Sequence, residues 1–175
     1  MNAYFDTSAL VKLLAPQEAG SDLARAIWDS TDLAVTSRIA YVEARAAMAA
    51  DSRSGRVAGT DQRESGRALE EFLQAMDVID VTPEIVRAAG DLAEAHGLRG
   101  YDAVHLASSL TLDLDDTVLV TWDRELARAG YASGLDLAGI SLERRPHARP
   151  ATRARPLAPV ARPPCSPRGA VDSEM

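Results

Sequence analysis

Cysteine is almost absent from this sequence, and its scarcity limits the kinds of site the chain can form. Cys165 is the only cysteine among 175 residues, so an internal disulfide and a multi-cysteine metal site are both excluded. The same scarcity fits a reducing compartment. Long hydrophobic runs are missing too, because no stretch approaches the ~18 uncharged apolar residues that a membrane span needs. We therefore expect a protein that does not insert into a membrane.

The first residues also lack the features of a secretory signal peptide. No basic residue precedes Lys12, and Asp6 interrupts the first apolar run. A signal peptide instead joins a basic start to an uninterrupted apolar segment. We expect a cytoplasmic protein.

What is present is a globular composition with an uneven distribution of charge. The chain is 46% hydrophobic and 26% charged, with a net charge of -7, which indicates one domain of ordinary size. Up to Glu143 there are 12 Lys+Arg against 24 Asp+Glu, a balance of -12. From Arg144 onward 7 Arg face 2 acids, a balance of +5. Such an acidic body argues against nucleic acid as a ligand, because phosphates are attracted by Lys and Arg.

Short apolar segments alternate with amphipathic helical patterns along the acidic part of the chain. Strands are predicted at residues 3–5, 33–36, 78–81 and 118–122, with a last edge strand at 135–142. Helices are predicted at 7–14, 18–30, 37–50, 61–76, 83–96, 101–110 and 124–129. Thr7 or Ser8 is expected to cap the first helix, and Gly130 to end the last. The alternation predicts an α/β fold with a parallel central sheet covered by helices on both faces.

The predicted helix after the second strand carries an acid beside its apolar face. Ile39, Val42, Ala46 and either Ala49 or Ala50 repeat at helical spacing, and we expect them to face the core. Glu43 then lies at a partly core-facing position.

The composition changes abruptly after Glu143. The remainder holds seven of the nine prolines and almost no large apolar side chains, which is typical of a disordered segment. We therefore predict one domain at 1–143 and a basic, Pro/Arg-rich disordered tail at 144–175. The tail is either a basic arm that attracts phosphates or an extension without function.

Four acids lie at strand ends or in the first turns of helices in this predicted topology. Asp6 ends the first strand and Asp123 ends the fourth, while Glu43 and Asp102 lie in the first turns of their helices. In open α/β sheets, ligands bind outside the carboxyl ends of the strands. We expect all four side chains at that edge.

The chemistry of such a cluster points to a metal ion. Neighbouring carboxylates repel one another and are costly to bury unpaired, so a cation is expected among them. With no His or Cys at ligand spacing beside them, an all-oxygen site favours Mg²⁺ or Mn²⁺ over zinc. Such ions polarise phosphoryl oxygens and lower the pKa of bound water. The pattern therefore predicts phosphodiester hydrolysis.

Each of these residues also has a simpler structural interpretation. An Asp at a strand end, such as Asp6 or Asp123, commonly caps the next helix, and Asp102 suits the positive end of a helix dipole. Glu43 is harder to explain in this way, because an acid bordering an apolar stripe needs a partner. His105 either reaches the site or is a satisfied core histidine.

Four segments together resemble the PIN-domain ribonucleases, and among them the VapC toxins of type II toxin-antitoxin systems. These segments are YFDTSALVKLL at 4–14, SRIAYVEARAA at 37–47, LRGYDAVHLASSL at 98–110 and VLVTWDREL at 118–126. The resemblance covers roughly residues 2–142, with the motifs in the family's order. It implies a Rossmann-like α/β fold with an acidic Mg²⁺ or Mn²⁺ pocket that cuts RNA.

The resemblance also assigns roles to seven positions. Four match the family's catalytic and metal-binding acids: Asp6, Glu43, Asp102 and Asp123. Three match small polar positions that support the acids or the metal-bound water: Thr7, Ser8 and Thr121. The family further implies a cognate VapB-like antitoxin whose C-terminal segment inhibits the site, toxin homodimers and higher toxin-antitoxin assemblies. The tail at 144–175 has no counterpart in the family's pattern.

Other functional classes fit less well. A haloacid-dehalogenase-type phosphatase needs a second Asp two residues after the first, where this chain has Ser8. A response-regulator receiver needs a lysine after a late strand, and Lys12 is the only lysine here. Two alternatives stay open within the PIN fold: an RNA-processing nuclease that is not a toxin, and a non-catalytic antitoxin-binding regulatory module. The function predicted is metal-dependent endonucleolytic cleavage of RNA.

Overall fold

The computed structural model describes residues 1–53, 59–112 and 115–140, with the side chains of 59–62 left out. The predicted boundary after Glu143 and the predicted tail lie outside these residues. Within them, no helix is long and apolar enough to cross a membrane.

A five-stranded parallel sheet forms the centre of the described structure. Its strands are β1 (Asn2–Phe5), β2 (Leu33–Ser37), β3 (Asp77–Ile79), β4 (Thr117–Thr121) and β5 (Asp136–Gly139). They are arranged in the order β3-β2-β1-β4-β5, and every neighbouring pair is parallel. The predicted fold class is confirmed.

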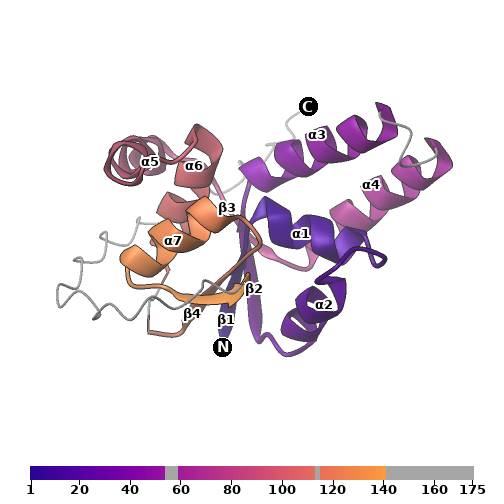
Figure 1. The fold of residues 1–175 in the computed structure, drawn as a ribbon, viewed down its shortest axis with the longest axis horizontal. Helices are drawn as coiled ribbons and strands as arrows, with labels where there is room; N and C mark the ends of the chain where they lie inside the picture. The colour runs from indigo at the N-terminus through magenta and orange to yellow at the C-terminus, as the bar shows by residue number, and fades with distance from the viewer. Residues whose placement is uncertain (54–58, 113–114, 141–175) are drawn as a thin grey trace, which may run out of the picture.

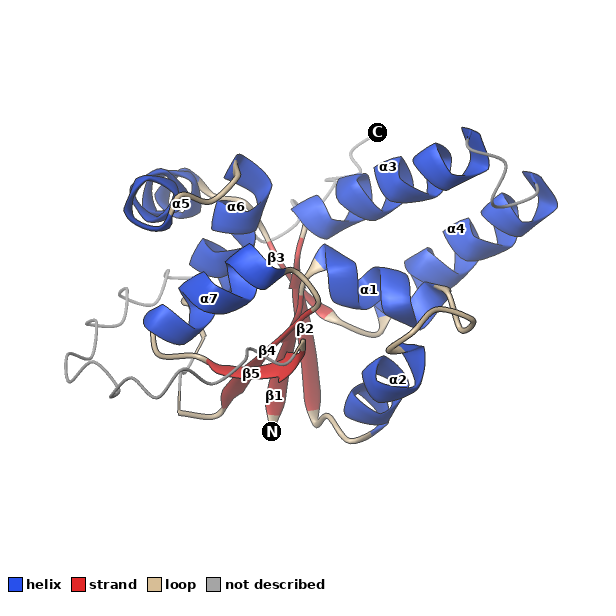
Figure 2. Cartoon of the chain, in the orientation of Figure 1, coloured by secondary structure: helices blue, strands red, loops and turns tan. Residues whose placement is uncertain are grey.

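Helices cover both faces of this sheet, as Figures 1 and 2 show. On one face lie α1 (Thr7–Leu14), α2 (Ser21–Asp29), α3 (Ile39–Arg53) and α4 (Gly59–Gln74). On the other lie α5 (Pro83–His96), α6 (Gly100–Ser109) and α7 (Arg124–Ala132).

The alternation of side chains along the central strands creates a separate core on each face. Tyr4 and Leu119 pack in the core beneath α5, α6 and α7. Phe5 and Val120 pack in the other core, beneath α1 to α4. All four are fully buried. Central strands with apolar side chains on both faces are what a parallel sheet covered by two helical layers requires.

The order of the strands reverses at β1, which has β2 on one side and β4 on the other. Phe5 pairs with Val120 in the β1–β4 register. Asp6, the next residue after β1, therefore lies beside the end of β4. This reversal is where open α/β sheets bind ligands.

Two local predictions about helix ends were wrong. Asp6, rather than Thr7 or Ser8, caps α1: its backbone is extended and its carboxylate accepts a hydrogen bond from Ala9 N. Gly130 does not end α7, which continues to Ala132. A Cβ at Gly130 would lie 2.6 Å from Leu119 Cδ2, so this glycine allows α7 to pack closely on β4.

The predicted inner face of α3 was also wrong. The buried residues are Ala40 and Ala44, whereas Val42 is 61% exposed. Small side chains allow this helix to approach α1 closely, and apolar size alone does not reveal that preference. Glu43 nevertheless lies at the border of the buried face, as expected.

Candidate active site

The structure places all four predicted acids at the carboxyl edge of the sheet. Asp6 lies between β1 and α1, and Asp123 between β4 and α7. Glu43 lies in the second turn of α3, and Asp102 in the first turn of α6. The helices that carry these acids come from both layers, so the carboxyl edge is where the two layers meet.

Asp6 is buried and surrounded by hydrogen-bond donors. Its Oδ1 accepts hydrogen bonds from Ala9 N and Ser8 Oγ, each at 2.8 Å. Its Oδ2 accepts one from Thr121 Oγ1 at 2.7 Å. Burial raises the pKa of Asp6, while the charge of His105 and these hydrogen bonds act in the opposite direction. Ser8 and Thr121 thus contact this acid directly, in the positions where supporting residues were predicted.

Ser8 and Thr121 also tie α1 to the end of β4. Trp122 N donates to Ser8 Oγ at 2.7 Å, and Asp123 N donates to Thr121 Oγ1 at 2.9 Å. Each hydroxyl therefore accepts a backbone hydrogen while donating its own to Asp6. This arrangement fixes the position of Asp123 relative to Asp6.

Asp123 caps α7 with one of its two carboxylate oxygens. Oδ1 accepts hydrogen bonds from Glu125 N at 2.8 Å and Leu126 N at 2.9 Å. None of the hydrogen bonds found among the described residues uses Oδ2. The capping interpretation is therefore correct for both Asp6 and Asp123, and it leaves Asp123 Oδ2 available to a ligand.

Glu43 is held by two partners on one oxygen. Oε2 accepts a hydrogen bond from Thr7 Oγ1 at 2.7 Å and lies 2.8 Å from His105 Nε2. Burial by itself would raise the pKa of Glu43, but the bonds to His105 and Thr7 and the charge of His105 outweigh it and lower this pKa. Glu43 is thus an ionised carboxylate, and Thr7 contacts the acid that it was predicted to support.

His105 and Tyr4 extend this cluster into the core. His105 is only 2% exposed, so it is a satisfied core histidine and also reaches the site. Its Nδ1 lies 2.9 Å from the hydroxyl of the fully buried Tyr4. The contribution of Tyr4 was missed, although a tyrosine in a buried strand needs a partner for its hydroxyl. For His105, the sequence did hold a clue, since it follows Asp102 by three positions, which places both on one side of α6.

Asp102 experiences the repulsion that was expected of clustered acids. Burial is the largest cause that raises its pKa, followed by the negative charges of Asp123 and Glu43. The charges of Arg99 and His105 oppose this shift without cancelling it. A half-buried carboxylate facing two others is stabilised by a cation.

The donor set suits a hard divalent ion in its chemistry, since carboxylate oxygens are the ligands that Mg²⁺ and Mn²⁺ prefer. In the part of the chain that the structure describes, however, no group of three or more His, Cys, Asp or Glu side chains is placed to hold one ion together. The residues therefore fit an ion that contacts one or two carboxylates and keeps several waters, which is how proteins usually bind Mg²⁺.

Known proteins match this chain over most of its length. The PIN domain family model matches residues 3–131. Ribonuclease VapC45 and Ribonuclease VapC49, from two strains of Mycobacterium tuberculosis, are each 44% identical to the chain over 140 residues. These alignments cover 80% of this chain and 96% of each relative.

Solved structures share the fold at lower sequence identity. VapBC2 from Rickettsia felis, bound to a DNA fragment from its promoter, matches with a TM-score of 0.55 and 16% identity, covering 81% of this chain and 100% of that chain. The sarcin-ricin loop cleaving toxin VapC20 from Mycobacterium tuberculosis matches with a TM-score of 0.58 and 18% identity, covering 73% of this chain and 95% of that one. The sequence matches and the shared fold lead to one conclusion: the chain belongs to the PIN-domain family, within its VapC branch.

Proposed function

We propose that this protein is a metal-dependent endoribonuclease and the toxin of a type II toxin-antitoxin system. The observation that carries the proposal is the position of Asp102, whose pKa is raised by burial and by the charges of Asp123 and Glu43. Acids that repel one another beside the strand reversal are expected where a cation takes part in the function. The names of the relatives that are 44% identical to the chain support RNA as the substrate.

The proposed cofactor is Mg²⁺ or Mn²⁺, bound among Asp6, Glu43, Asp102 and Asp123. A bound ion of this kind polarises a phosphoryl oxygen and lowers the pKa of a bound water. On the protein side, Asp123 Oδ2, Glu43 Oε1 and both carboxylate oxygens of Asp102 are left without hydrogen bonds among the described residues. Asp102 adds a carboxylate that caps no helix.

The surrounding residues keep these carboxylates in place. Asp6 is held by Ala9 N, Ser8 and Thr121, so its side chain has little freedom to rotate. The same donors stabilise its ionised form against the effect of burial. We infer that Ser8 and Thr121 serve the site by keeping Asp6 oriented and charged.

We further propose a VapB-like antitoxin as the partner, because the solved structures that share this fold include VapBC toxin-antitoxin assemblies. The acidic body, with its balance of -12 up to Glu143, suits a basic antitoxin segment. A homodimer that joins larger toxin-antitoxin assemblies is part of the same proposal.

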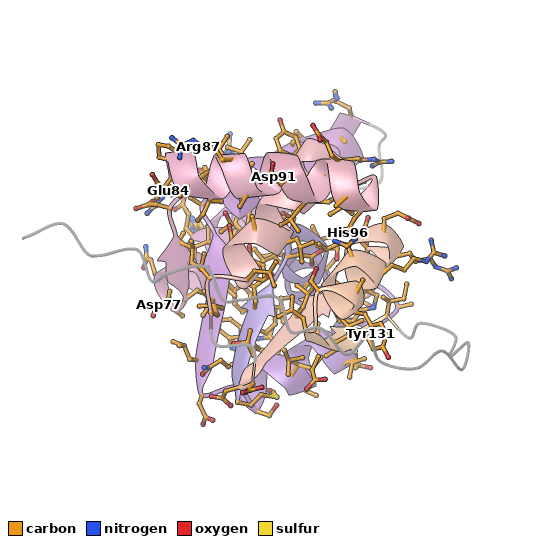
Figure 3. The ribbon with its side chains drawn as sticks, turned by 90° about the vertical axis from the view of Figure 1, so that its left-hand side faces the viewer. Asp77, Glu84, Arg87, Asp91, His96 and Tyr131 are labelled. Carbon is orange, nitrogen blue, oxygen red and sulfur yellow. The ribbon has the colours of Figure 1, made fainter. Side chains whose placement is uncertain are left out.

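The nuclease proposal is tested by in vitro cleavage of RNA by the full-length protein and two acid variants. Asp102→Asn removes a charge without removing a helix cap, and Asp91→Asn is the matched control on the exposed surface of α5 (Figure 3). We expect the wild type and Asp91→Asn to cleave RNA in the presence of Mg²⁺, and this cleavage to cease when EDTA is added. Asp102→Asn is expected to cleave no RNA under either condition. Cleavage by Asp102→Asn at the wild-type rate would contradict the site. A wild type that binds antitoxin and never cleaves RNA would favour the non-catalytic alternative.

A further inference from the structure

A chain of hydrogen bonds runs from the core to Glu43 through a buried histidine. His105 Nδ1 lies 2.9 Å from the Tyr4 hydroxyl. On the other side of the ring, Nε2 lies 2.8 Å from Glu43 Oε2 and 3.0 Å from Thr7 Oγ1. The four residues belong to β1, α6, α3 and α1, so the chain joins elements from both helical layers.

The direction of the hydrogen bonds follows from the chemistry of the partners. A carboxylate offers only lone pairs, so Nε2 carries a hydrogen and donates it to Glu43. This holds whether the ring is neutral or charged. In the neutral ring, Nδ1 is then the acceptor and the Tyr4 hydroxyl donates to it. Both ring nitrogens of His105 are thereby engaged.

This arrangement rules out one role for His105 and favours another. A general base needs a free lone pair within reach of the proton that it removes, and His105 has none: Nε2 faces Glu43 and Nδ1 faces the buried Tyr4. The ring and the Thr7 hydroxyl together hold one oxygen of Glu43, Oε2.

We propose that His105 is a positioning residue. Its Nε2–H group holds Glu43 Oε2 in place, which would leave Glu43 Oε1 free to bind a divalent ion. Tyr4 in turn fixes the orientation of the ring. The inference rests on the proposed function for the identity of the ion. Partners that orient a metal-binding side chain commonly contribute 10–100-fold to metal affinity.

The location of this series of hydrogen bonds supports a functional role for it. Tyr4 packs among apolar side chains in the core beneath α5, α6 and α7, and the buried His105 bonds to its hydroxyl. Polar groups at such a position are costly unless each finds a partner. Close to the Tyr4 hydroxyl, the buried Ser108 Oγ donates to Ser37 Oγ at 3.4 Å. Burying this series has a cost, and holding the Glu43 carboxylate in one orientation is a function that would account for it.

Two substitutions of His105 separate positioning from packing. A glutamine side chain places its amide N–H near the position of the ring Nε2, whereas an asparagine side chain reaches only to the position of Nδ1. His105→Gln therefore keeps a donor for Glu43, and His105→Asn removes it. His96→Asn, at the end of α5 (Figure 3), is the control at a histidine outside the chain of hydrogen bonds.

The first readout is the affinity of the full-length protein for Mn²⁺ alone, measured by calorimetry. We expect His105→Asn to weaken Mn²⁺ binding about 10–100-fold, with His105→Gln and His96→Asn close to the wild type. Equal affinity in wild type and a folded His105→Asn would overturn the inference. Should His105→Asn fail to fold, Mn²⁺ affinity is compared in Thr7→Val and Thr7→Ser instead. Thr7→Val removes the second hydrogen-bond donor to Glu43 and Thr7→Ser keeps it, so only Thr7→Val is expected to bind Mn²⁺ more weakly.

The second readout needs no metal and no substitution of the histidine. Long-range ¹H–¹⁵N correlation spectra of the wild-type ring are expected to show a hydrogen on Nε2, and Tyr4→Phe is expected to shift the Nδ1 resonance. A ring whose Nε2 carries no hydrogen overturns the inference, whatever the result of RNA cleavage. Conversely, a protonated Nε2 with weakened Mn²⁺ binding in His105→Asn supports the inference even if the wild type cleaves no RNA, in which case only the proposed function fails.

Discussion

At the scale of single residues, Asp6 and Asp123 have an observed structural role and, under the proposed function, a chemical one. Each caps the helix that follows it, using an oxygen that accepts backbone N–H groups. Capping fixes the carboxylate at the end of its strand, where the proposed function would use it as a metal ligand. The two interpretations that their positions in the sequence allowed are therefore compatible.

Asp102 differs because no hydrogen bond holds it within the described residues, and its charge opposes folding. Its pKa is raised in the folded protein by burial and by Asp123 and Glu43. The folded state consequently loses stability as pH rises from the ordinary value of 3.8 through the raised one. We expect Asp102→Asn to stabilise the metal-free protein at neutral pH by up to about 1 kcal/mol, or roughly 2–4 °C in Tm.

Thermal unfolding of both proteins from pH 3 to pH 8, with EDTA, measures this effect. The gain in Tm is expected to disappear at the acid end, where Asp102 is protonated in both the folded and the unfolded state. A gain that is constant across this range would mean that charge repulsion is not its cause.

Thr121 is the residue that joins two of the acids, because its hydroxyl donates to Asp6 and accepts from Asp123 N. Thr121→Val keeps the shape and removes both bonds. We expect RNA cleavage to fall about 10–100-fold and Thr121→Ser to restore most of it. Rate measurements on the three proteins at saturating Mg²⁺ check this, and a Thr121→Val variant as active as the wild type would show that the hydroxyl is dispensable.

The residues that could be predicted from the sequence are those whose position follows from a local pattern. Asp6 and Asp123 follow strands, and a parallel sheet places them at one edge. The bond between Tyr4 and His105 joins residues 101 positions apart, and only tertiary packing brings them together. For the same reason, the partner that Glu43 was expected to need could not be named.

At the scale of elements, strands were more predictable than the faces of helices. Each predicted strand overlaps an observed one, because short apolar segments between helical patterns are distinctive. The face of α3 was not predictable in the same way, since Ala40 and Ala44 are buried while Val42 is exposed. Close helix packing selects small side chains there, and that choice depends on the neighbouring helix.

Gly130 shows the same effect between a helix and a strand. A Cβ at this position would lie 2.6 Å from Leu119 Cδ2, on a fully buried strand residue. We expect Gly130→Ala to destabilise the protein by about 1–3 kcal/mol through overpacking, despite the better helix propensity of alanine. Gly90→Ala on α5 is the control, since nothing lies within 4 Å of its Cβ position, and it is expected to stabilise by about 0.5–1 kcal/mol.

Urea unfolding of the two glycine variants provides the comparison. The free energy of unfolding is expected to fall in Gly130→Ala and to rise in Gly90→Ala. If Gly130→Ala were as stabilising as Gly90→Ala, the close approach of α7 and β4 would not be a constraint on the fold.

At the scale of the whole molecule, the uneven charge acquires a physical explanation. Up to Glu143 the balance is -12, and four of these acids lie together at the carboxyl edge of the sheet. Under the proposed function, bound cations offset part of this charge, so the acidity of the body no longer argues against RNA as a substrate. The tail at 144–175, with its balance of +5, carries none of the seven predicted site residues.

Truncation after Glu143 is accordingly expected to leave both RNA cleavage and the salt dependence of RNA affinity unchanged, because the family match ends at residue 131. RNA affinity measured against salt concentration for the full-length and truncated proteins provides the check. A smaller salt slope after truncation would contradict this expectation and assign the tail to phosphate binding.

The measurement that tests the central claim most directly is the mapping of new RNA 5′ ends after expression of the wild type and of Asp6→Asn, a substitution that retains a capping side chain. With equal amounts of folded protein, the proposed function predicts discrete new 5′ ends and growth arrest with the wild type, and neither with Asp6→Asn. The same 5′ ends in both would contradict the claim that the acids at the carboxyl edge of the sheet form a ribonuclease site.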